Sequence, residues 1–193
     1  MSNLSTTSDD ILSCAKTLII SGGYNGFSYA DIASVVGIRK ASIHHHFPSK
    51  VDLVKALIVR HREDTEAGFA NLESKVVDPL EQLHAYTEYW SACITDGTAS
   101  FCVGALLASE LPVLPQELIP EIQAYFRALS RWLTSVLTRG AQLGRIRLIE
   151  GPEIEAEAFM ATVHGAMLSA RAYGDPKTFS LIVEPLLGRL SAA

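Results

Sequence analysis

The sequence lacks the features that mark disulfide-bonded, metal-binding or membrane-spanning chains. Only three of its 193 residues are cysteine, an odd number without metal-like spacing, so we expect no disulfide framework and no metal site. No apolar run reaches about eighteen residues, and the first residues contain neither a basic start nor an apolar signal region. We therefore expect a cytoplasmic protein without a membrane partner.

Catalytic and cofactor-binding motifs are also missing. The chain has no nucleotide-binding glycine loop, no Gly-x-Ser-x-Gly turn, no His-Glu-x-x-His and no paired cysteine motif. The acids Glu153, Glu155 and Glu157 fit a helix start, where carboxylates complement the helix dipole, better than a catalytic pair. We expect a binding protein that is not an enzyme and uses no cofactor. A helical-bundle enzyme or an interaction protein without DNA affinity stays open as an alternative.

Apolar residues and an uneven charge are what the chain does have. Apolar residues make up 48% of it and the mean hydropathy is +0.21, enough for one sizeable core or two small ones. The net charge is −5, yet residues 1–60 hold six Lys and Arg against four Asp and Glu, a net +2. Between Ile38 and Arg62, six basic residues accompany one acid, Asp52. This local +5 suits a nucleic-acid backbone, whereas the acidic remainder would repel it.

Residues 37–50 predict the second half of a helix-turn-helix. Gly37 can adopt the left-handed conformation that ends the preceding apolar run at residues 31–36. A short helix over residues 39–47 then has only Ile43 and Phe47 on an apolar seam. At roughly 12 Å its length matches the roughly 12 Å width of the DNA major groove. Its other faces carry donors, namely Arg39, Lys40, Ser42, His44 and His45.

Three histidines follow one another in this short helix. Successive helical residues diverge by about 100°, so His44, His45 and His46 cannot converge on one metal ion. We predict instead that His46 packs near Phe47, and that His44 and His45 face the DNA.

Residues 37–53, which end in Ser49-Lys50-Val51-Asp52-Leu53, resemble the signature of the TetR/AcrR transcriptional repressors. That signature typically reads Gly-Val-Ser-Lys-Gly-Ser-Leu-Tyr-His-His-Phe-Pro-Ser-Lys-Glu-Glu-Leu. The resemblance is close over about the first quarter of the chain and extends to the other helices in outline. It implies phosphate or base contacts from Ser28, Lys40, Ala41, His44, His45 and Lys50, to which the donors of the short helix add Arg39 and Ser42. Arg39 stands where a small hydroxyl residue is usual and adds a possible contact. His44 stands where Tyr is usual, which puts one phosphate contact of the family in doubt.

Capping residues predict an all-α fold of about nine helices. The pairs Thr7 with Asp10, Ser28 with Asp31 and Ser49 with Asp52 would begin the first, second and fourth helices. Capping residues, prolines and glycines further along the chain place helices at about residues 50–72, 79–97, 100–111, 121–144, 152–174 and 176–190. The charged stretch of the fourth helix, residues 50–72, is predicted to be a solvated connector. Residues 1–48 would form a three-helix DNA-binding domain, and residues 49–193 a bundle for ligand binding and dimerisation.

Aromatic residues in the bundle have two interpretations. They form either a packed core or an apolar pocket for a small-molecule effector, and the resemblance implies such a cavity. The candidate lining residues are Tyr86, Tyr89, Trp90, Cys93, Cys102, Leu106, Phe126, Phe159 and His164. We predict a repressor that such an effector releases from DNA.

Cys102 raises an alternative mode of regulation. It precedes the sixth helix as in some electrophile-responsive family members, and a thiol at a helix N-terminus has a lowered pKa. A thiol-based sensor acting through Cys102 therefore stays open beside a buried, inert cysteine.

A homodimer on a palindromic operator is the last prediction. One short recognition helix reads too few base pairs to find a unique site, so a second copy is needed. The last two helices have apolar groups on more than one face, some of which also serve the chain's own core. The candidate interface residues are Phe159, Val163, Ala166, Met167, Phe179, Val183, Leu186 and Leu187.

Overall fold

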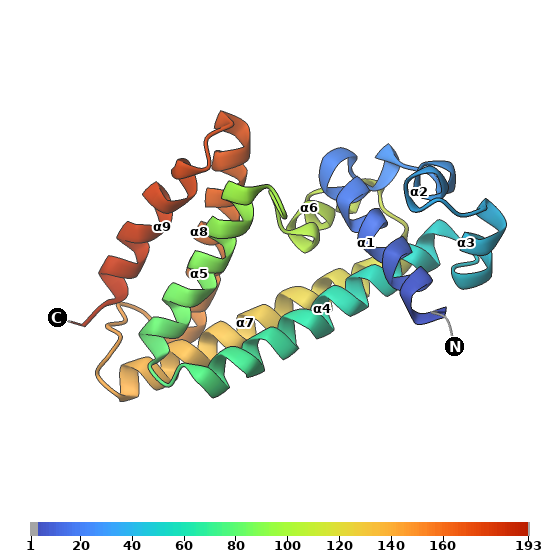
Figure 1. Cartoon of the computed structure of the whole chain (residues 1–193). Helices are drawn as coiled ribbons and strands as arrows, with labels where there is room; N and C mark the ends of the chain where they lie inside the picture. The colour runs from blue at the N-terminus through green and yellow to red at the C-terminus, as the bar shows by residue number, and fades with distance from the viewer. Residues whose placement is uncertain (1–3, 193) are drawn as a thin grey trace. The chain divides into compact units, whose positions relative to one another are not determined.

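The computed structural model describes residues 4–192 and folds them into nine α-helices without a β-strand (Figure 1). The predicted all-α fold is confirmed. The helices are α1 (Leu4–Gly22), α2 (Tyr29–Val36), α3 (Lys40–His46), α4 (Lys50–Lys75), α5 (Pro79–Asp96), α6 (Val103–Ser109), α7 (Ile119–Gln142), α8 (Pro152–Tyr173) and α9 (Lys177–Leu190). Short 3-10 turns lie at Tyr24–Gly26, Leu111–Val113 and Gln116–Leu118. Within the described residues, no helix has the length and apolar character needed to cross a membrane.

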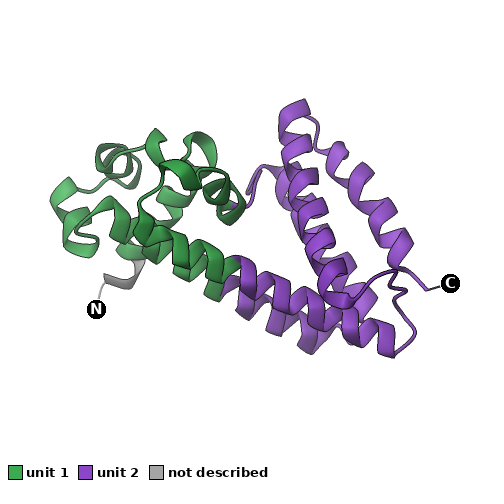
Figure 2. Ribbon diagram, turned by 180° about the vertical axis from the view of Figure 1, so that it is seen from behind, with its two compact units in different colours: residues 1–63, 103–125 green, residues 64–102, 126–193 purple. Residues whose placement is uncertain are grey.

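The chain divides into two compact units (Figure 2). Unit 1 contains residues 1–63 and 103–125, and unit 2 contains residues 64–102 and 126–193. Helices α4 and α7 each contribute one part to each unit. Unit 1 therefore holds α1 to α3 together with α6.

Local capping explains where the helices next to the short recognition helix begin and end. Ser28 and Asp31 form the predicted capping box of α2, and Gly37 ends α2 with a left-handed φ of 74°. At α4 the Ser49 hydroxyl accepts from the Asp52 backbone N–H at 3.2 Å, and the Asp52 carboxylate accepts from the Ser49 backbone N–H at 3.0 Å. These caps fix α3 between two short, defined turns.

The predicted bounds of two helices and the predicted role of a third differ from the structure. Helix α1 begins at Leu4, so Thr7 lies inside the helix and is not its cap. Helix α6 starts only at Val103 and ends at Ser109, because the chain turns at Leu111–Val113 instead of continuing. Helix α4 is also more than a solvated connector, since Phe69 is only 9% exposed.

Unit 1 packs around apolar residues of α1 to α4, and α6 is tied to it. The fully buried residues Ile11 and Ile19 of α1, Ile32 of α2 and Ile43 of α3 share this core. The carboxylate of Glu110, which follows α6, accepts the backbone N–H of Tyr24 at 2.8 Å. A Cβ at Gly23 would lie 2.0 Å from this carboxylate, and Gly23 also has a φ of +76°. Only glycine fits this turn without a shift.

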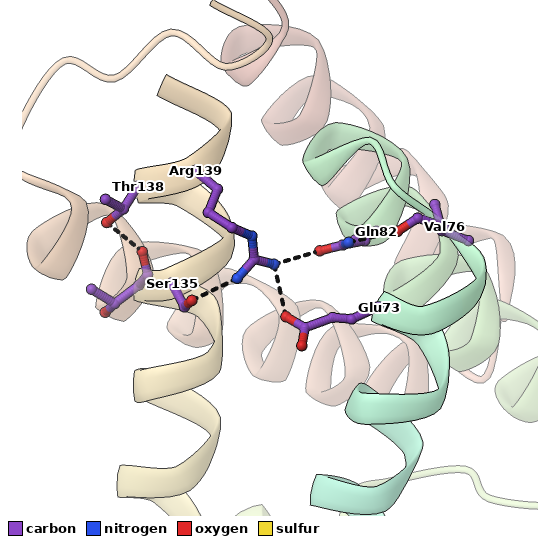
Figure 3. Close-up of polar contacts among 7 residues, drawn as sticks. Glu73, Val76, Gln82, Ser135, Thr138 and Arg139 are labelled. Atoms are coloured by element: carbon purple, nitrogen blue, oxygen red, sulfur yellow. Dashed lines mark hydrogen bonds and ion pairs between the residues drawn. The ribbon is translucent and has the colours of Figure 1, made fainter. Parts of the chain in front are cut away.

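In unit 2, a polar link joins three helices (Figure 3). The Arg139 guanidinium on α7 donates to Glu73 of α4 at 2.7 Å, to Gln82 of α5 at 2.9 Å and to Ser135 at 2.6 Å. Gln82 is 2% exposed and donates in turn to the Val76 carbonyl at 2.7 Å. The end of α4 is thereby joined to α5 and α7 by hydrogen bonds with charged character.

Candidate DNA-binding surface and ligand-binding region

Helix α3 contacts its own unit through one narrow seam. Ile43 is fully buried and Phe47 is 7% exposed, as predicted from their spacing. The Tyr29 hydroxyl of α2 donates to the Phe47 carbonyl at 2.9 Å and fixes the end of α3. The candidate DNA-contact side chains of the segment are all exposed, namely those of Arg39, Lys40, Ala41, Ser42, His44 and His45.

His46 lies near Phe47, as the sequence predicted. The His46 ring is near that of Phe47, with centroids 6.3 Å apart, while His44 and His45 are exposed. His44 is nevertheless held in place, because its Nδ1 lies 3.2 Å from the Pro48 carbonyl oxygen and its ring centroid 4.8 Å from that of Tyr29. Among the described residues, no group of three or more His, Cys, Asp or Glu side chains is arranged to hold a metal ion.

Ser28 is exposed and already serves the cap of α2. Its hydroxyl donates to the Asp31 carboxylate at 2.7 Å and accepts the Ala30 backbone N–H at 3.2 Å. Hydrogen bonds from the Ser28 side chain and backbone hold the pKa of Asp31 below its usual value. Ser28 is therefore positioned at a helix N-terminus, where backbone N–H groups favour an anion.

Lys50 is less free than the sequence suggested. Its ammonium lies 4.0 Å from the centroid of the Phe27 ring and 4.8 Å from that of Tyr24, and it donates to the Phe27 carbonyl. Burial lowers the pKa of this half-buried lysine. The aromatic residues Tyr24, Phe27 and Tyr29, which position Lys50 and His44, were missed because nothing in their spacing distinguishes such a role from core packing.

Comparison with known proteins identifies this arrangement. A family model described as bacterial regulatory proteins, tetR family, matches residues 11–57, which contain α2 and α3. A TetR-family transcriptional regulator from Agrobacterium tumefaciens, known from a crystal structure, is 60% identical in sequence to this chain. The two structures align with a TM-score of 0.95 over 98% of this chain and 100% of that chain. The chain belongs to the TetR family.

Two further relatives agree with this assignment. A TetR transcriptional regulator from Legionella pneumophila has a structure 29% identical to this chain, with a TM-score of 0.86 over 98% of this chain and 100% of that chain. The uncharacterized HTH-type transcriptional regulator YvkB of Bacillus subtilis is 24% identical over 187 residues, 96% of this chain and 94% of its own length. The protein is thus a transcriptional regulator with a helix-turn-helix, and such regulators are not enzymes.

Most of the predicted ligand-binding residues of the regulator lie inside unit 2. Tyr86, Trp90, Cys93, Cys102 and Phe159 are at most 9% exposed, and Phe126 and His164 are half-buried. Two predicted residues do not fit this group: Leu106 falls in unit 1, and Tyr89 is 58% exposed.

The aromatic residues of unit 2 form a continuous cluster. Phe69 and Trp132 are stacked with centroids 3.9 Å apart, and Tyr86 lies 5.5 Å from Trp132 and 6.4 Å from Phe159. Phe69 was missed because it sits in the charged stretch of α4, where a single aromatic residue gives no periodic signal. These ring contacts match the packed-core interpretation at this point of the unit.

Three buried side-chain nitrogen atoms in the described part of unit 2 lack a hydrogen-bond partner. They are the indole Nε1 atoms of Trp90 and Trp132 and the imidazole Nε2 of His164. The His164 ring meets the edge of Phe126 at 5.5 Å, and burial lowers the pKa of His164 to about 4. An unpaired polar atom in the interior of a folded chain is costly and uncommon.

Cys102 has no exposed surface and immediately precedes α6. A sensor thiol must be reached by the compound that modifies it. The geometry therefore matches the buried, inert interpretation better than the reactive one.

The eight predicted dimer residues belong to the chain's own core. Each of them is 6% exposed or less, because α8 and α9 pack these faces inside unit 2. They are thus unavailable to a partner unless the unit opens. A different set of α8 residues is exposed, apolar or small, and spaced alternately by four and three residues: Ile154, Ala158, Ala161, Gly165, Leu168 and Ala172.

Proposed function

We propose that this regulator is a ligand-responsive repressor that binds a palindromic operator as a homodimer. The observation that carries the proposal is α3: Ile43 within this short helix and Phe47 directly after it are buried, while the candidate DNA-contact side chains from Arg39 to His45 are exposed. A helix held by so thin a seam leaves most of its circumference for a DNA groove.

The candidate contact side chains divide into two roles. Arg39, Ser42 and His45 are suited to base edges, because donors at the start and on the outer face of a recognition helix enter the major groove. Ser28 and Lys50 are suited to phosphates, Ser28 through the N-terminus of α2 and Lys50 by charge. Lys40 and Ala41 complete the surface. Residues 1–48 are the proposed DNA-binding domain, and residues 49–193 serve ligand binding and dimerisation.

Dimerisation follows from the reach of one α3. Two copies must meet successive major grooves about 34–36 Å apart, or a multiple of that spacing, on a two-fold symmetric site. The exposed stripe of α8 supports this assembly, because Gly165 and its alanines would allow close helix approach between Ile154 and Leu168, which are 59% and 58% exposed.

The effector is proposed to enter the aromatic region of unit 2. The unpaired Nε1 of Trp132 and Nε2 of His164 support a mostly apolar compound with a hydrogen-bonding group, since its binding would satisfy atoms that are now unpaired. Effector binding would lower DNA affinity, and linkage requires DNA to weaken effector binding by the same factor. Regulation through Cys102 remains the alternative, and its burial speaks against it.

DNA binding by fragments from the neighbourhood of the regulator's own gene tests the proposal. We expect a dissociation constant of roughly 10⁻⁹ to 10⁻⁷ M with a steep salt dependence. Arg39→Ala should change the bases selected from a random pool. Lys177→Ala on α9 removes the same charge outside this surface and should change neither affinity nor selection. The same assay, run with small aromatic compounds, should reveal one that releases the DNA.

Two results would contradict the proposal. The DNA-binding part fails if wild-type protein selects no sequence from the pool at low salt. The placement of α3 fails if Arg39→Ala and Lys177→Ala behave alike.

A further inference from the structure

The orientation of His44 determines which of its nitrogens can contact DNA. Its Nδ1 lies 3.2 Å from the carbonyl oxygen of Pro48, and a carbonyl oxygen only accepts hydrogen bonds. Nδ1 therefore carries a proton in this arrangement. The nitrogen left for another partner on this exposed side chain is Nε2.

A neutral ring with its proton on Nδ1 has only a lone pair at Nε2. Phosphate oxygens also offer only lone pairs, so a neutral His44 cannot donate to a phosphate. The tyrosine that the family signature has at this position carries a hydroxyl, which donates at any pH well below 10. His44 can take its place only as an imidazolium, with a second proton on Nε2.

Neighbouring residues hold the ring ready for this contact. The Tyr29 ring of α2 packs at 4.8 Å, and its hydroxyl is fixed on the Phe47 carbonyl at 2.9 Å. Burial raises the pKa of Tyr29 to about 12, so this neighbour stays uncharged in the physiological range. The ring of His44 thus has a defined position before DNA arrives.

The charged and titratable groups of α3 and of the start of α4 are in place without DNA. Lys40 and His45 lie on α3 with His44, Lys50 begins α4, and the Asp52 carboxylate accepts a hydrogen bond from the Ser49 hydroxyl. A DNA phosphate adds a full negative charge at the contact itself, which favours the imidazolium.

We propose that His44 takes up one proton from solvent when the regulator binds DNA, and then donates Nε2–H to a phosphate oxygen. Operator binding is consequently linked to pH. This inference rests on the proposed contact of α3 with DNA and adds to it the protonation state in which the contact forms.

Operator affinity measured from pH 8 to pH 6 at constant ionic strength tests the inference. Wild-type protein should bind on the order of tenfold more tightly at pH 6 than at pH 8. His44→Tyr and His44→Gln supply a donor that needs no added proton, so both should remove most of this dependence, and His44→Tyr should bind tightly already at pH 8.

Other histidines provide the controls. Burial lowers the pKa of both His61 and His164 to about 4, so neither titrates between pH 6 and pH 8. His46→Gln, which changes the ring that lies near Phe47, should keep the pH dependence of the wild-type protein. The imidazole ¹⁵N signals of His44 should show both nitrogens protonated in the DNA complex at pH 7, a readout independent of any variant.

The possible failures are distinguishable. Wild-type protein that binds no operator at any pH contradicts the proposed function. Tight wild-type binding that is independent of pH contradicts this inference alone. So does an undiminished pH dependence in His44→Tyr that has kept its fold, as judged by circular dichroism.

Discussion

Two histidines inside the chain are uncharged because of where their rings lie. His61 of α4 stacks on Tyr125 at 4.9 Å in unit 1, and His164 meets Phe126 at 5.5 Å in unit 2. Burial lowers the pKa of each to about 4, with a smaller contribution from Lys16 at His61. In the unfolded chain an imidazole titrates near pH 6.5. The unfolded state therefore binds more protons than the folded state between these two values.

We predict that the free energy of unfolding falls as the pH is lowered from about 6.5 towards 4. Above about pH 6.5, both histidines are neutral in the folded and in the unfolded chain, and stability is at its full value. Between about pH 6.5 and pH 4, only the unfolded chain binds protons at these two residues, so the unfolded state is favoured and stability is lost. His164→Phe should reduce the difference between pH 7 and pH 5 by about 1–2 kcal/mol in urea unfolding. His45→Gln, which changes an exposed ring, should leave that difference unaltered. Equal differences in wild-type and His164→Phe would contradict the prediction.

Helices α4 and α7 are joined by ion pairs of different quality. Arg139 reaches Glu73 at 2.7 Å and also bonds the buried Gln82, as Figure 3 shows. Arg131 reaches Glu66 only at 3.8 Å, and its side chain is 68% exposed. Exposed pairs contribute little, whereas loss of a partner inside a hydrogen-bonded network leaves buried atoms unsatisfied.

Arg139→Met should therefore destabilise the protein by about 1–3 kcal/mol, because Gln82 and Glu73 both lose their donor. Arg131→Met is the matched control from the same pair of helices and should cost no more than about 0.5 kcal/mol. Urea unfolding at pH 7 measures both. Similar losses of unfolding free energy in the two variants would show that the network around Gln82 stabilises the protein no more than the exposed ion pair does.

The proposed dimer depends on the exposed side of α8. Apart from its chain neighbours and the nearby backbone of its own helix, a Cβ at Gly165 would meet no atom of the chain within 4 Å, so a larger side chain there has room in the single chain. The same holds for Gly68 on α4, which lies outside the stripe. Substitutions at Gly165 and Gly68 can therefore distinguish an effect on the dimer interface from an effect on the fold of the single chain.

Sedimentation at micromolar concentration should give about 42 kDa for the wild-type protein, twice the 20.9 kDa of one chain. Gly165→Glu should give folded monomers with weakened operator binding, because a charge would replace the small residue between two close helices. Gly68→Glu should remain dimeric. A dimeric Gly165→Glu would move the interface away from this stripe.

The sequence by itself determined the features that depend on neighbouring residues. Ser28 with Asp31, Ser49 with Asp52 and Gly37 cap helices through contacts spanning a few residues, so α2, α3 and the start of α4 could be predicted. The seam of Ile43 and Phe47 follows from helical spacing in the same way. The exposed donors of α3 were predictable because everything that the seam does not bury must face outward.

Only the tertiary structure decided which apolar faces turn inward and what holds the polar side chains. Apolar spacing marked Val183 and Leu186 as candidates for a dimer, but spacing cannot tell the chain's own core from a partner, and packing assigned them to the core. The bond between His44 and Pro48 and the aromatic enclosure of Lys50 likewise required the folded chain. The physical reason is that these features depend on contacts between groups whose relative positions are set only when the chain folds. Such contacts determine which tautomer a histidine adopts, which side chains are buried and which groups are charged.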